Sequence, residues 1–244
     1  MPPADILLKD MFLAQHRIKG MIRTTPVIES PWLSQQSGRP VRLKLENLQN
    51  TGSFKLRGAA NALLTLSDSQ KANGVLAFST GNHGRAVAWV ARQLGIRCVV
   101  CLSERVPAFR VQALKDFGAQ VVQKGTSQDD AYDVALTLEK QDHLTLINPF
   151  DDPFVIAGQG TIGLEILTQA PDIDTLVVPV SGGGLAAGVA MVLKTADPAI
   201  RVIGVSMECG PAMYRSIEAG RPVAVEEKDS LADALLGGIG LDNQ

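Results

Sequence analysis

The chain has 244 residues, of which 45% are apolar and 20% charged, with 23 lysines and arginines against 25 aspartates and glutamates. This composition suits folded α/β domains with apolar cores and excludes a disordered chain. The net charge of −2, without a concentrated basic run, argues against nucleic acid as a partner. No apolar stretch approaches the roughly 20 residues that span a bilayer, so we expect a cytoplasmic protein without a membrane partner.

The first 73 residues predict a helix, a strand and then a polar turn. Residues 7–20 (LLKDMFLAQHRIKG) repeat apolar side chains at helical spacing, and residues 41–46 (VRLKLE) read as a strand. The segment TGSFKLRG, residues 51–58, follows and places one lysine, Lys55, among small residues, an aromatic and an arginine. A solvated lysine keeps its proton at neutral pH, so any chemistry of Lys55 depends on its surroundings.

From residue 74, strands and helices alternate at short spacing, which predicts a parallel sheet with right-handed crossovers. The predicted strands are residues 74–79, 96–103, 119–124 and 144–148. The predicted helices are residues 82–95, residues 107–118 with Pro107 in the first helical position, and a third helix capped by Ser127. We therefore predict a small α/β domain over residues 74–149.

Two of the three cysteines, Cys98 and Cys101, have the C-x-x-C spacing of a redox or zinc motif. They lie in an apolar, β-branched run, and residues three apart in a strand point to opposite faces. We interpret them as small buried apolar side chains.

The last part of the chain predicts a second α/β run. Asp152 can cap a helix that begins with a proline, and the strands 175–180 (TLVVPV) and 201–206 (RVIGVS) flank a glycine-rich turn and a helix. We predict that residues 1–73 and 150–244 form one larger domain into which the small domain is inserted. Ligands bind in the cleft between such domains, at the carboxyl ends of strands.

The glycine-rich turn is SGGG, Ser181 to Gly184. Consecutive glycines let backbone N–H groups approach an anion, and the helix N-terminus adds partial positive charge, so we predict a phosphate site. A tight turn without a ligand is one alternative. A dinucleotide site is another, because Gly182, Gly184 and Ala187 fit G-x-G-x-x-A and Glu208 ends the next strand, although this unit lies far down the chain.

A second polar turn, STGNHGRA, also joins a strand to a helix. The hydroxyls of Ser79 and Thr80, the permissive Gly81 and the N-H groups of the helix start suit a carboxylate, and Asn82 and His83 add polar groups. The alternative is an ordinary capped helix, with Ser79 or Asn82 as the cap and His83 solvated.

Lys55 is the third feature. A lysine near a phosphate site and a carboxylate site suggests a cofactor with one phosphate and an aldehyde, which is pyridoxal 5'-phosphate held as a Schiff base. Phe54 is expected to pack against the cofactor ring and Arg57 to anchor the turn. The prediction depends on the combination, because a single lysine in a loop is structural far more often than catalytic.

The motifs SFKLRGA, STGNHGRAVA, AGQGTIGLEI, PVSGGGLAAG and VIGVSME together resemble those of the fold type II pyridoxal phosphate enzymes. This is the group of tryptophan synthase β, threonine dehydratase and serine racemase, and the resemblance implies two three-layer α/β domains with parallel sheets. The segments TGSFKLRGAANALL, SQDDA and LADALLGGIGLDNQ are similar to the hydroxyectoine utilisation dehydratases, a branch near the threonine and serine dehydratases.

The resemblance implies a role for each turn. Lys55 carries the cofactor, Phe54 flanks its ring and Asn82 binds the ring hydroxyl. The residues that cradle the phosphate through backbone N–H groups are Ser181, Gly182, Gly183, Gly184 and Leu185. The residues that hold the substrate carboxylate, in the small domain, are Ser79, Gly81 and His83. Gly238 is expected to approach the edge of the cofactor.

The implied reaction is the dehydration of a β-hydroxy amino acid. Lys55 removes the Cα proton, the β-hydroxyl leaves as water, and hydrolysis gives a 2-oxo acid and ammonia. Serine, threonine, 3-hydroxyaspartate and an opened hydroxyectoine derivative are the candidate substrates. Thr80 stands where serine racemases have a serine that moves protons on the second face of the substrate. Racemisation by Lys55 and Thr80 is therefore an alternative.

The chain also departs from the family pattern. Family chains continue well past residue 244, so the C-terminal part of the large domain, with the group that faces the pyridine nitrogen, is expected to be missing. A catalytically silent protein that binds a phosphate-bearing metabolite is the alternative outside the enzyme class. No metal is predicted, because the family's cation site needs carboxylates and this chain has only Glu208 there, with Met213 nearby. A homodimer is expected by analogy.

Overall fold

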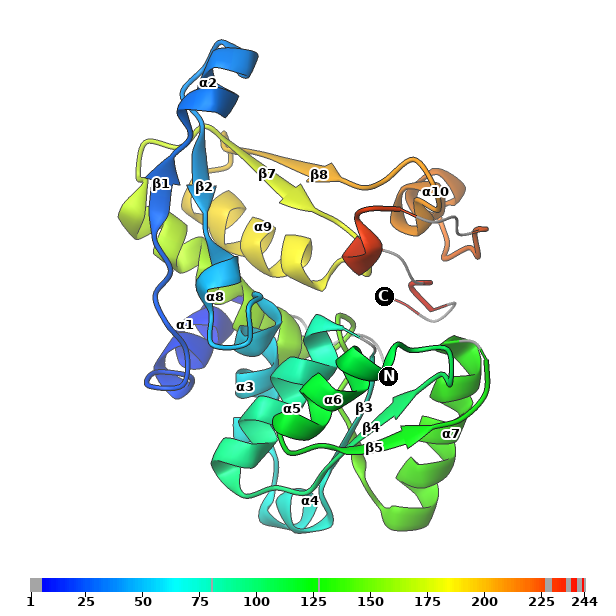
Figure 1. The fold of residues 1–244 in the computed structure, drawn as a ribbon. Coiled ribbons are helices and arrows are strands. Elements are labelled where there is room, and N and C mark those ends of the chain that lie inside the picture. Colours follow the sequence, from blue (N-terminus) through cyan, green and yellow to red (C-terminus); the bar gives the residue numbers. More distant parts are fainter. Residues whose placement is uncertain are drawn as a thin grey trace.

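The structure, a computed structural model, describes residues 6–79, 81–126, 128–226, 230–235, 238–240 and 243. Thr80 and Ser127, which the sequence analysis singled out, lie outside these ranges. Figure 1 shows two layered parts, one above the other, with helix α3 (Lys55–Thr65) at their junction. Helix α3 packs against helices of both parts.

The lower part is built on a four-stranded parallel sheet. Its strands lie in the order β5 (Gln120–Gln123), β4 (Cys98–Leu102), β3 (Val75–Phe78) and β6 (Thr145–Leu146). Strand β3 is central and pairs with both β4 and β6. This sheet confirms the prediction that the alternating strands and helices of this region form a parallel sheet.

Helices cover both faces of the sheet (Figure 1). Helices α5 (Asn82–Leu94) and α6 (Ala108–Asp116) share one apolar cluster with Cys98, and α7 (Gln128–Asp142) shares another with Cys101. The two thiols therefore lie on opposite faces, and both residues are buried. This confirms that the C-x-x-C spacing belongs to two buried apolar side chains.

One predicted helix boundary is wrong by one residue. Pro107 is the N-cap of α6 and not its first helical residue, because its ψ of 141° is extended. Gly118 follows the end of the helix as predicted, with a φ of 93° that favours glycine.

The upper part places helices against a second, two-stranded parallel sheet. The strands are β7 (Thr175–Pro179) and β8 (Arg201–Val205), and the helices are α8 (Pro153–Gln169) and α9 (Gly184–Ala196). The predicted cap of α8 is confirmed, since Asp152 Oδ1 accepts a hydrogen bond from the Val155 N–H at 2.8 Å.

The N-terminal region flanks the upper part. Helix α1 (Leu8–Arg17) packs on α8, and the predicted strand is shorter than expected, as β2 (Arg42–Lys44). Strand β2 pairs antiparallel with β1 (Val27–Glu29), so this local pair differs from the parallel sheets. The remaining elements are α2 (Pro31–Ser37), η1 (Glu46–Leu48), α4 (Asp68–Asn73), α10 (Ala212–Ala219) and η2 (Asp233–Leu235).

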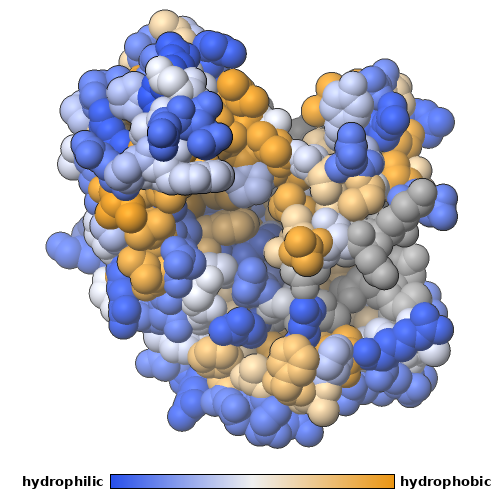
Figure 2. All heavy atoms as spheres, turned by 45° about the horizontal axis from the view of Figure 1, so that its top comes forward, coloured by the Kyte–Doolittle hydropathy of each residue, from blue (hydrophilic) through white to orange (hydrophobic). Residues whose placement is uncertain are grey.

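The outer face of β7 and β8 is apolar and exposed in the part of the chain that the structure describes. Val177, Ile203 and Val205 are 61%, 37% and 47% exposed, and Val177 lies opposite Ile203. Figure 2 shows apolar residues gathered around a hollow on this side of the molecule.

Helix α8 packs closely against both α3 and α9, because its glycines let the neighbouring helices approach. A methyl group added at Gly158 would lie 2.6 Å from the Gly58 Cα of α3. One added at Gly160 would lie 3.0 Å from the Gly188 oxygen of α9. Larger residues at these contacts would push the helices apart. Helix α8 thus sets the separation of α3, which begins at Lys55, and α9, which begins at the glycine turn.

A buried ion cluster holds the start of α3. Arg57 is fully buried and donates to Glu46 at 2.8 Å and to Glu165 at 2.7 Å. Lys44 Nζ also binds Glu165, so two cations balance two carboxylates. The cluster joins η1, β2, α3 and α8, and it gives Arg57 the anchoring contacts expected from the sequence.

Candidate active site

Lys55 is the first residue of α3, and its side chain reaches the segment that follows β6, an edge strand of the four-stranded sheet. Its Nζ donates a hydrogen bond to the Pro149 oxygen at 2.6 Å and lies 5.4 Å from the centre of the Phe54 ring. Burial lowers the pKa of Lys55 to about 8. A lysine with such a pKa supplies an appreciable fraction of neutral amine near pH 7 to 8, which the chemistry of a nucleophile or base requires.

The glycine turn connects β7 to α9 and is closely packed. A methyl group added at Gly182 would lie 2.2 Å from Cγ of Phe150, and one added at Gly184 would lie 2.5 Å from the Phe150 oxygen. Gly183 has a φ of 91°, and an added methyl there would lie 3.0 Å from Met213 Cε. Each glycine is therefore required by the packing of the turn itself.

The same turn offers backbone donors. The first intrahelical bond of α9 runs from the Ala187 N–H to the Gly183 oxygen at 2.9 Å. The N–H groups of the first helical turn before Ala187 have no acceptor within the helix, and they carry its partial positive charge. Ser181 is the first residue of the glycine turn, and Leu185, which follows it in α9, packs against an apolar cluster.

Pro149 and Phe150 link Lys55 to the glycine turn, and neither residue was predicted from the sequence. Pro149 supplies the acceptor for Lys55, and the next residue lies against Gly182 and Gly184. The amine and the glycine turn, which are far apart in the sequence, therefore share one neighbour. The pair Asn148-Pro149, at the end of the predicted strand 144–148, is a turn signal that points to this segment.

The start of α5 supplies the second polar turn. Gly81 is the N-cap and makes no side-chain capping bond, and Asn82 is the first helical residue. Ser79 Oγ accepts a bond from the Gly81 N–H at 3.3 Å. The alternative in which Ser79 or Asn82 caps the helix is thus not what the described residues show. Thr80 lies outside them.

His83 is buried, so the alternative in which it is solvated is wrong. Its Nε2 lies 2.8 Å from the Ile147 oxygen, and a carbonyl only accepts, so Nε2 carries the proton. Burial first, and then the nearby charge of Lys55, lower the pKa of His83 to about 3. The ring is therefore neutral, with a lone pair at Nδ1, and cannot donate to a carboxylate. Any contact of His83 with a substrate carboxylate would come from its backbone N–H.

Several buried polar atoms have no partner in the described part of the chain. They are Thr51 Oγ1, Ser53 Oγ, His83 Nδ1, Arg85 Nε and both amide atoms of Gln159. Thr51 and Ser53 lie just before Lys55 in the chain, and the charge of Lys55 acts on His83. Buried polar groups are normally satisfied, so such a cluster marks a place that accommodates a polar ligand or water.

Gly238 is exposed, and a methyl group added there would meet nothing within 4 Å. The C-terminal segment does reach the glycine turn, because Asn243 Nδ2 donates to the Gly182 oxygen at 3.4 Å and to the Ile239 oxygen at 2.9 Å.

The residues fit pyridoxal 5'-phosphate. The desolvated amine of Lys55 suits the aldehyde, and the open N–H groups at the start of α9 suit the phosphate. The unpartnered polar atoms near Lys55 suit the polar groups of a cofactor or substrate. Within the described residues, no group of three or more His, Cys, Asp and Glu side chains is placed to hold a metal ion, and no helix is long and apolar enough to cross a bilayer.

Comparison with known proteins agrees with this chemistry. Residues 18–243 match the family described as "Pyridoxal-phosphate dependent enzyme". A putative threonine dehydratase of Sinorhizobium fredii is 49% identical over 240 residues, which cover 98% of this chain and 72% of the relative. The L-threonine ammonia-lyase of Thermotoga maritima is 42% identical, with 94% of this chain and 57% of the relative covered. The structure of maize serine racemase has a TM-score of 0.91 at 33% identity and covers 95% of this chain and 70% of that one.

The fold and the match over most of the chain show that this protein belongs to the pyridoxal-phosphate dependent enzymes of fold type II. Within them it falls in the group of threonine dehydratases and serine racemases. The chain spans a little more than half the length of the L-threonine ammonia-lyase that it matches, 57%.

Proposed function

We propose that the protein is a pyridoxal phosphate-dependent dehydratase, which eliminates water from a β-hydroxy amino acid and releases a 2-oxo acid and ammonia. The observation that carries this proposal is the 2.6 Å bond between Lys55 Nζ and the Pro149 oxygen, because the next residue, Phe150, lies on the glycine turn. A desolvated amine thus stands beside a turn suited to a phosphate. The threonine dehydratase and ammonia-lyase relatives support the reaction class.

Pyridoxal phosphate, when bound, supplies an electron sink that stabilises negative charge at the substrate Cα. Lys55 carries the cofactor and then, as a neutral amine, takes the Cα proton at Nζ. The N–H groups from Ser181 to Leu185 would hold the phosphate, Phe54 would flank the ring, and Asn82 would bind the ring hydroxyl. The backbone N–H groups of the turn at Ser79, Gly81 and His83 hold the substrate carboxylate. Gly238 is proposed at the edge of the cofactor.

The substrate range is proposed from the sequence motifs and the relatives together. L-Threonine and L-serine are the leading substrates, because the relatives carry the names of threonine enzymes. A hydroxy amino acid derived from hydroxyectoine is proposed beside them, because of the motifs TGSFKLRGAANALL and LADALLGGIGLDNQ.

The organisation of the chain is part of the proposal. Residues 1–73 and 150–244 are assigned to a large cofactor-binding domain, and residues 74–149 to a small domain that receives the substrate carboxylate. The four-stranded sheet built from strands between residues 75 and 146 supports this division. A homodimer is proposed from the family resemblance, and a cytoplasmic location is proposed from the sequence.

Racemisation is a second candidate function, favoured by the fold match to maize serine racemase. In this version Lys55 and Thr80 exchange protons on opposite faces of the substrate. Thr80→Ala would then abolish formation of the D-isomer and leave ammonia release intact. Equal loss of both products would contradict this role of Thr80.

A catalytically silent ligand-binding protein is a third candidate, outside the enzymes. The specific observation in its favour is the glycine turn at the start of α9, whose N–H groups suit a phosphate whether or not a reaction follows. Such a protein would bind pyridoxal phosphate or another phosphate ester and release no ammonia.

The deciding experiment measures cofactor binding and turnover on the same purified protein. Pyridoxal phosphate is added, the visible absorbance band of the bound cofactor is recorded, and ammonia and 2-oxo acid are assayed with L-threonine, L-serine, 3-hydroxyaspartate and the opened hydroxyectoine derivative. Lys55→Ala is the test variant and Lys115→Ala, at an exposed position, is the matched control.

We expect the wild type and Lys115→Ala to show the band and release equimolar ammonia and 2-oxo acid, and Lys55→Ala to lose both. A band without ammonia from any substrate would favour the silent protein. A Lys55→Ala variant that keeps the wild-type band would refute the assignment of Lys55.

A further inference from the structure

Residues 147–150, at the end of β6 and in the turn after it, contact three parts of the candidate site. Ile147 accepts the bond from His83 Nε2 at 2.8 Å, and Pro149 accepts the bond from Lys55 Nζ at 2.6 Å. Phe150 lies against Gly182. One short segment therefore contacts His83 of the second polar turn, the amine of Lys55 and the glycine turn.

Asn148 shapes this turn from within. Its Oδ1 accepts hydrogen bonds from the backbone N–H groups of Phe150 at 3.1 Å and Asp151 at 2.9 Å. Pro149 has no N–H of its own and a nearly fixed φ. A side-chain acceptor that bonds the backbone two and three residues ahead closes the turn around the proline and fixes the direction of its carbonyl.

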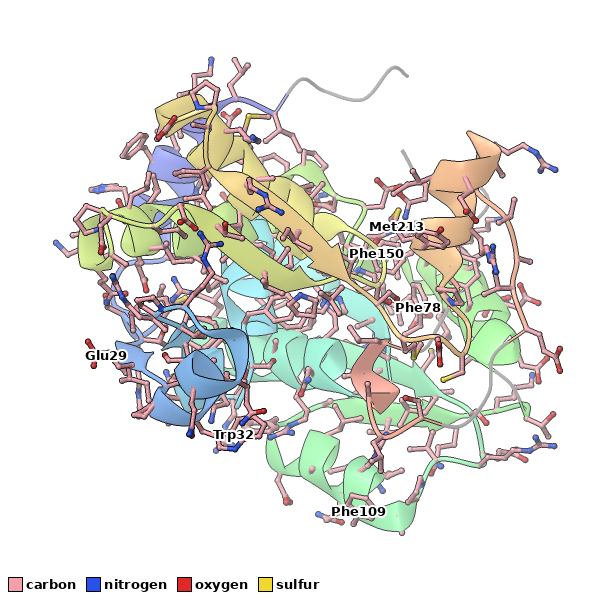
Figure 3. All side chains as sticks on the ribbon, turned by 90° about the horizontal axis from the view of Figure 1, so that it is seen from above. Glu29, Trp32, Phe78, Phe109, Phe150 and Met213 are labelled. Atoms are coloured by element: carbon pink, nitrogen blue, oxygen red, sulfur yellow. The ribbon has the colours of Figure 1, made fainter. Side chains whose placement is uncertain are left out.

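The side chain of Phe150, the residue after Pro149, packs on the glycine turn. Its Cγ would lie 2.2 Å from a methyl group added at Gly182, so the ring rests directly on the turn where only glycine leaves room. Met213 of α10 approaches the next residue of the same turn, because a methyl group added at Gly183 would lie 3.0 Å from its Cε. In the view from above, Phe150 and Met213 are drawn next to one another (Figure 3). The ring and α10 therefore approach the glycine turn at neighbouring residues.

We propose that Asn148 and Phe150 are positioning residues, which hold the Pro149 carbonyl, and through it the amine of Lys55, beside the glycine turn. Neither side chain needs to touch the reacting atoms. The inference rests on the proposed function, in which Lys55 bonds pyridoxal phosphate. It adds that the position of the amine is set by residues 148–150 as well as by helix α3.

The test uses full-length variants that separate the two sides of the turn. Asn148→Ala removes the acceptor, whereas Asn148→Asp keeps an oxygen at the same place. Phe150→Leu removes the ring but stays apolar. Phe109→Leu, at a position 70% exposed, is the matched control.

Three readouts are needed. The rate at which acetic anhydride acetylates Lys55 without any cofactor, followed by peptide mass spectrometry, reports whether the amine is held. The rate of attachment of pyridoxal phosphate to Lys55, trapped with borohydride, reports its placement toward the cofactor. The affinity for pyridoxamine 5'-phosphate, which has no aldehyde, reports the glycine turn alone.

We expect Asn148→Ala to acetylate on the order of tenfold faster and to attach pyridoxal phosphate on the order of tenfold more slowly, which corresponds to the free energy of about one hydrogen bond. Phe150→Leu should change both rates in the same directions. Asn148→Asp and Phe109→Leu should stay within about twofold of the wild type, and the pyridoxamine phosphate affinity of Asn148→Ala should change less than about threefold.

Unchanged rates in Asn148→Ala and Phe150→Leu would overturn the inference. So would a parallel loss of pyridoxamine phosphate affinity that Asn148→Asp does not restore, because the turn would then serve only the fold. If acetylation responds as expected but wild-type Lys55 attaches no pyridoxal phosphate, the positioning of the amine stands and the proposed function fails.

Discussion

The amine of Lys55 and the carbonyl oxygen of Pro149 lie 2.6 Å apart, although the two residues are 94 positions apart in the sequence. This contact places the first residue of α3 against the turn after β6. It keeps the amine in a desolvated place with a fixed acceptor, and burial brings its pKa to about 8.

The reactivity of Lys55 should depend on pH differently from that of surface lysines. Burial disfavours the charged amine, so the neutral form appears at lower pH. The acetylation rate of Lys55 should therefore rise with a midpoint near pH 8, below the usual lysine value of about 10.4. Peptide mass spectrometry across a pH series measures this rate. A midpoint at the usual lysine value would rule out a desolvated Lys55.

His83 should make the protein less stable in acid. Its pKa is about 3 in the folded state, against about 6.5 when unfolded, so between these values the unfolded chain binds a proton that the folded chain does not. Stability should then fall as pH drops below about 6.5, by roughly 2 kcal/mol at pH 5. His83→Gln keeps a donor for Ile147 and removes the titration. Urea unfolding at pH 7.5 and pH 5 should show a larger loss in the wild type than in this variant, and equal losses would contradict the assignment.

Arg57 should be the most costly charge to remove. It is fully buried between Glu46 and Glu165, so Arg57→Met leaves two carboxylates with less compensation, and breaking such a pair costs about 3–5 kcal/mol. Arg215→Met breaks an exposed pair with Glu218 and should leave stability nearly unchanged. Urea denaturation compares the two. Similar midpoints for both variants would show that the cluster contributes little.

Gly182→Ala should act through Phe150. The added methyl would lie 2.2 Å from the Phe150 ring, so the ring must move, and overpacking of this kind costs about 1–3 kcal/mol. Phe150→Ala in the same chain provides room for the methyl. The double variant should therefore lose less stability than the two single changes added together. Thermal unfolding of the wild type, the two single variants and the double variant measures this. If the two losses of stability simply add, Gly182→Ala does not act through Phe150.

Much of the fold could be predicted because its signals are local. The parallel sheet from β3 to β6 follows from alternating strands and helices, and the Asp152 cap from an acidic residue before a proline. The boundary at Pro107 was misplaced by one residue, since proline suits both the cap and the first helical position. The pairing of β2 with β1 could not be predicted, because the partner of a short strand depends on which segments meet in three dimensions.

The candidate site also has parts that the sequence predicts and parts that it does not. Lys55, the glycine turn and the start of α5 each have a recognisable local pattern, and the sequence by itself determined the family and the cofactor through their combination. Only the tertiary structure decided that Pro149 and Phe150 join the lysine to the glycine turn, and that the His83 ring is buried and neutral. Backbone conformation responds to neighbouring residues, whereas desolvation and hydrogen bonding at these positions depend on residues brought from elsewhere in the chain.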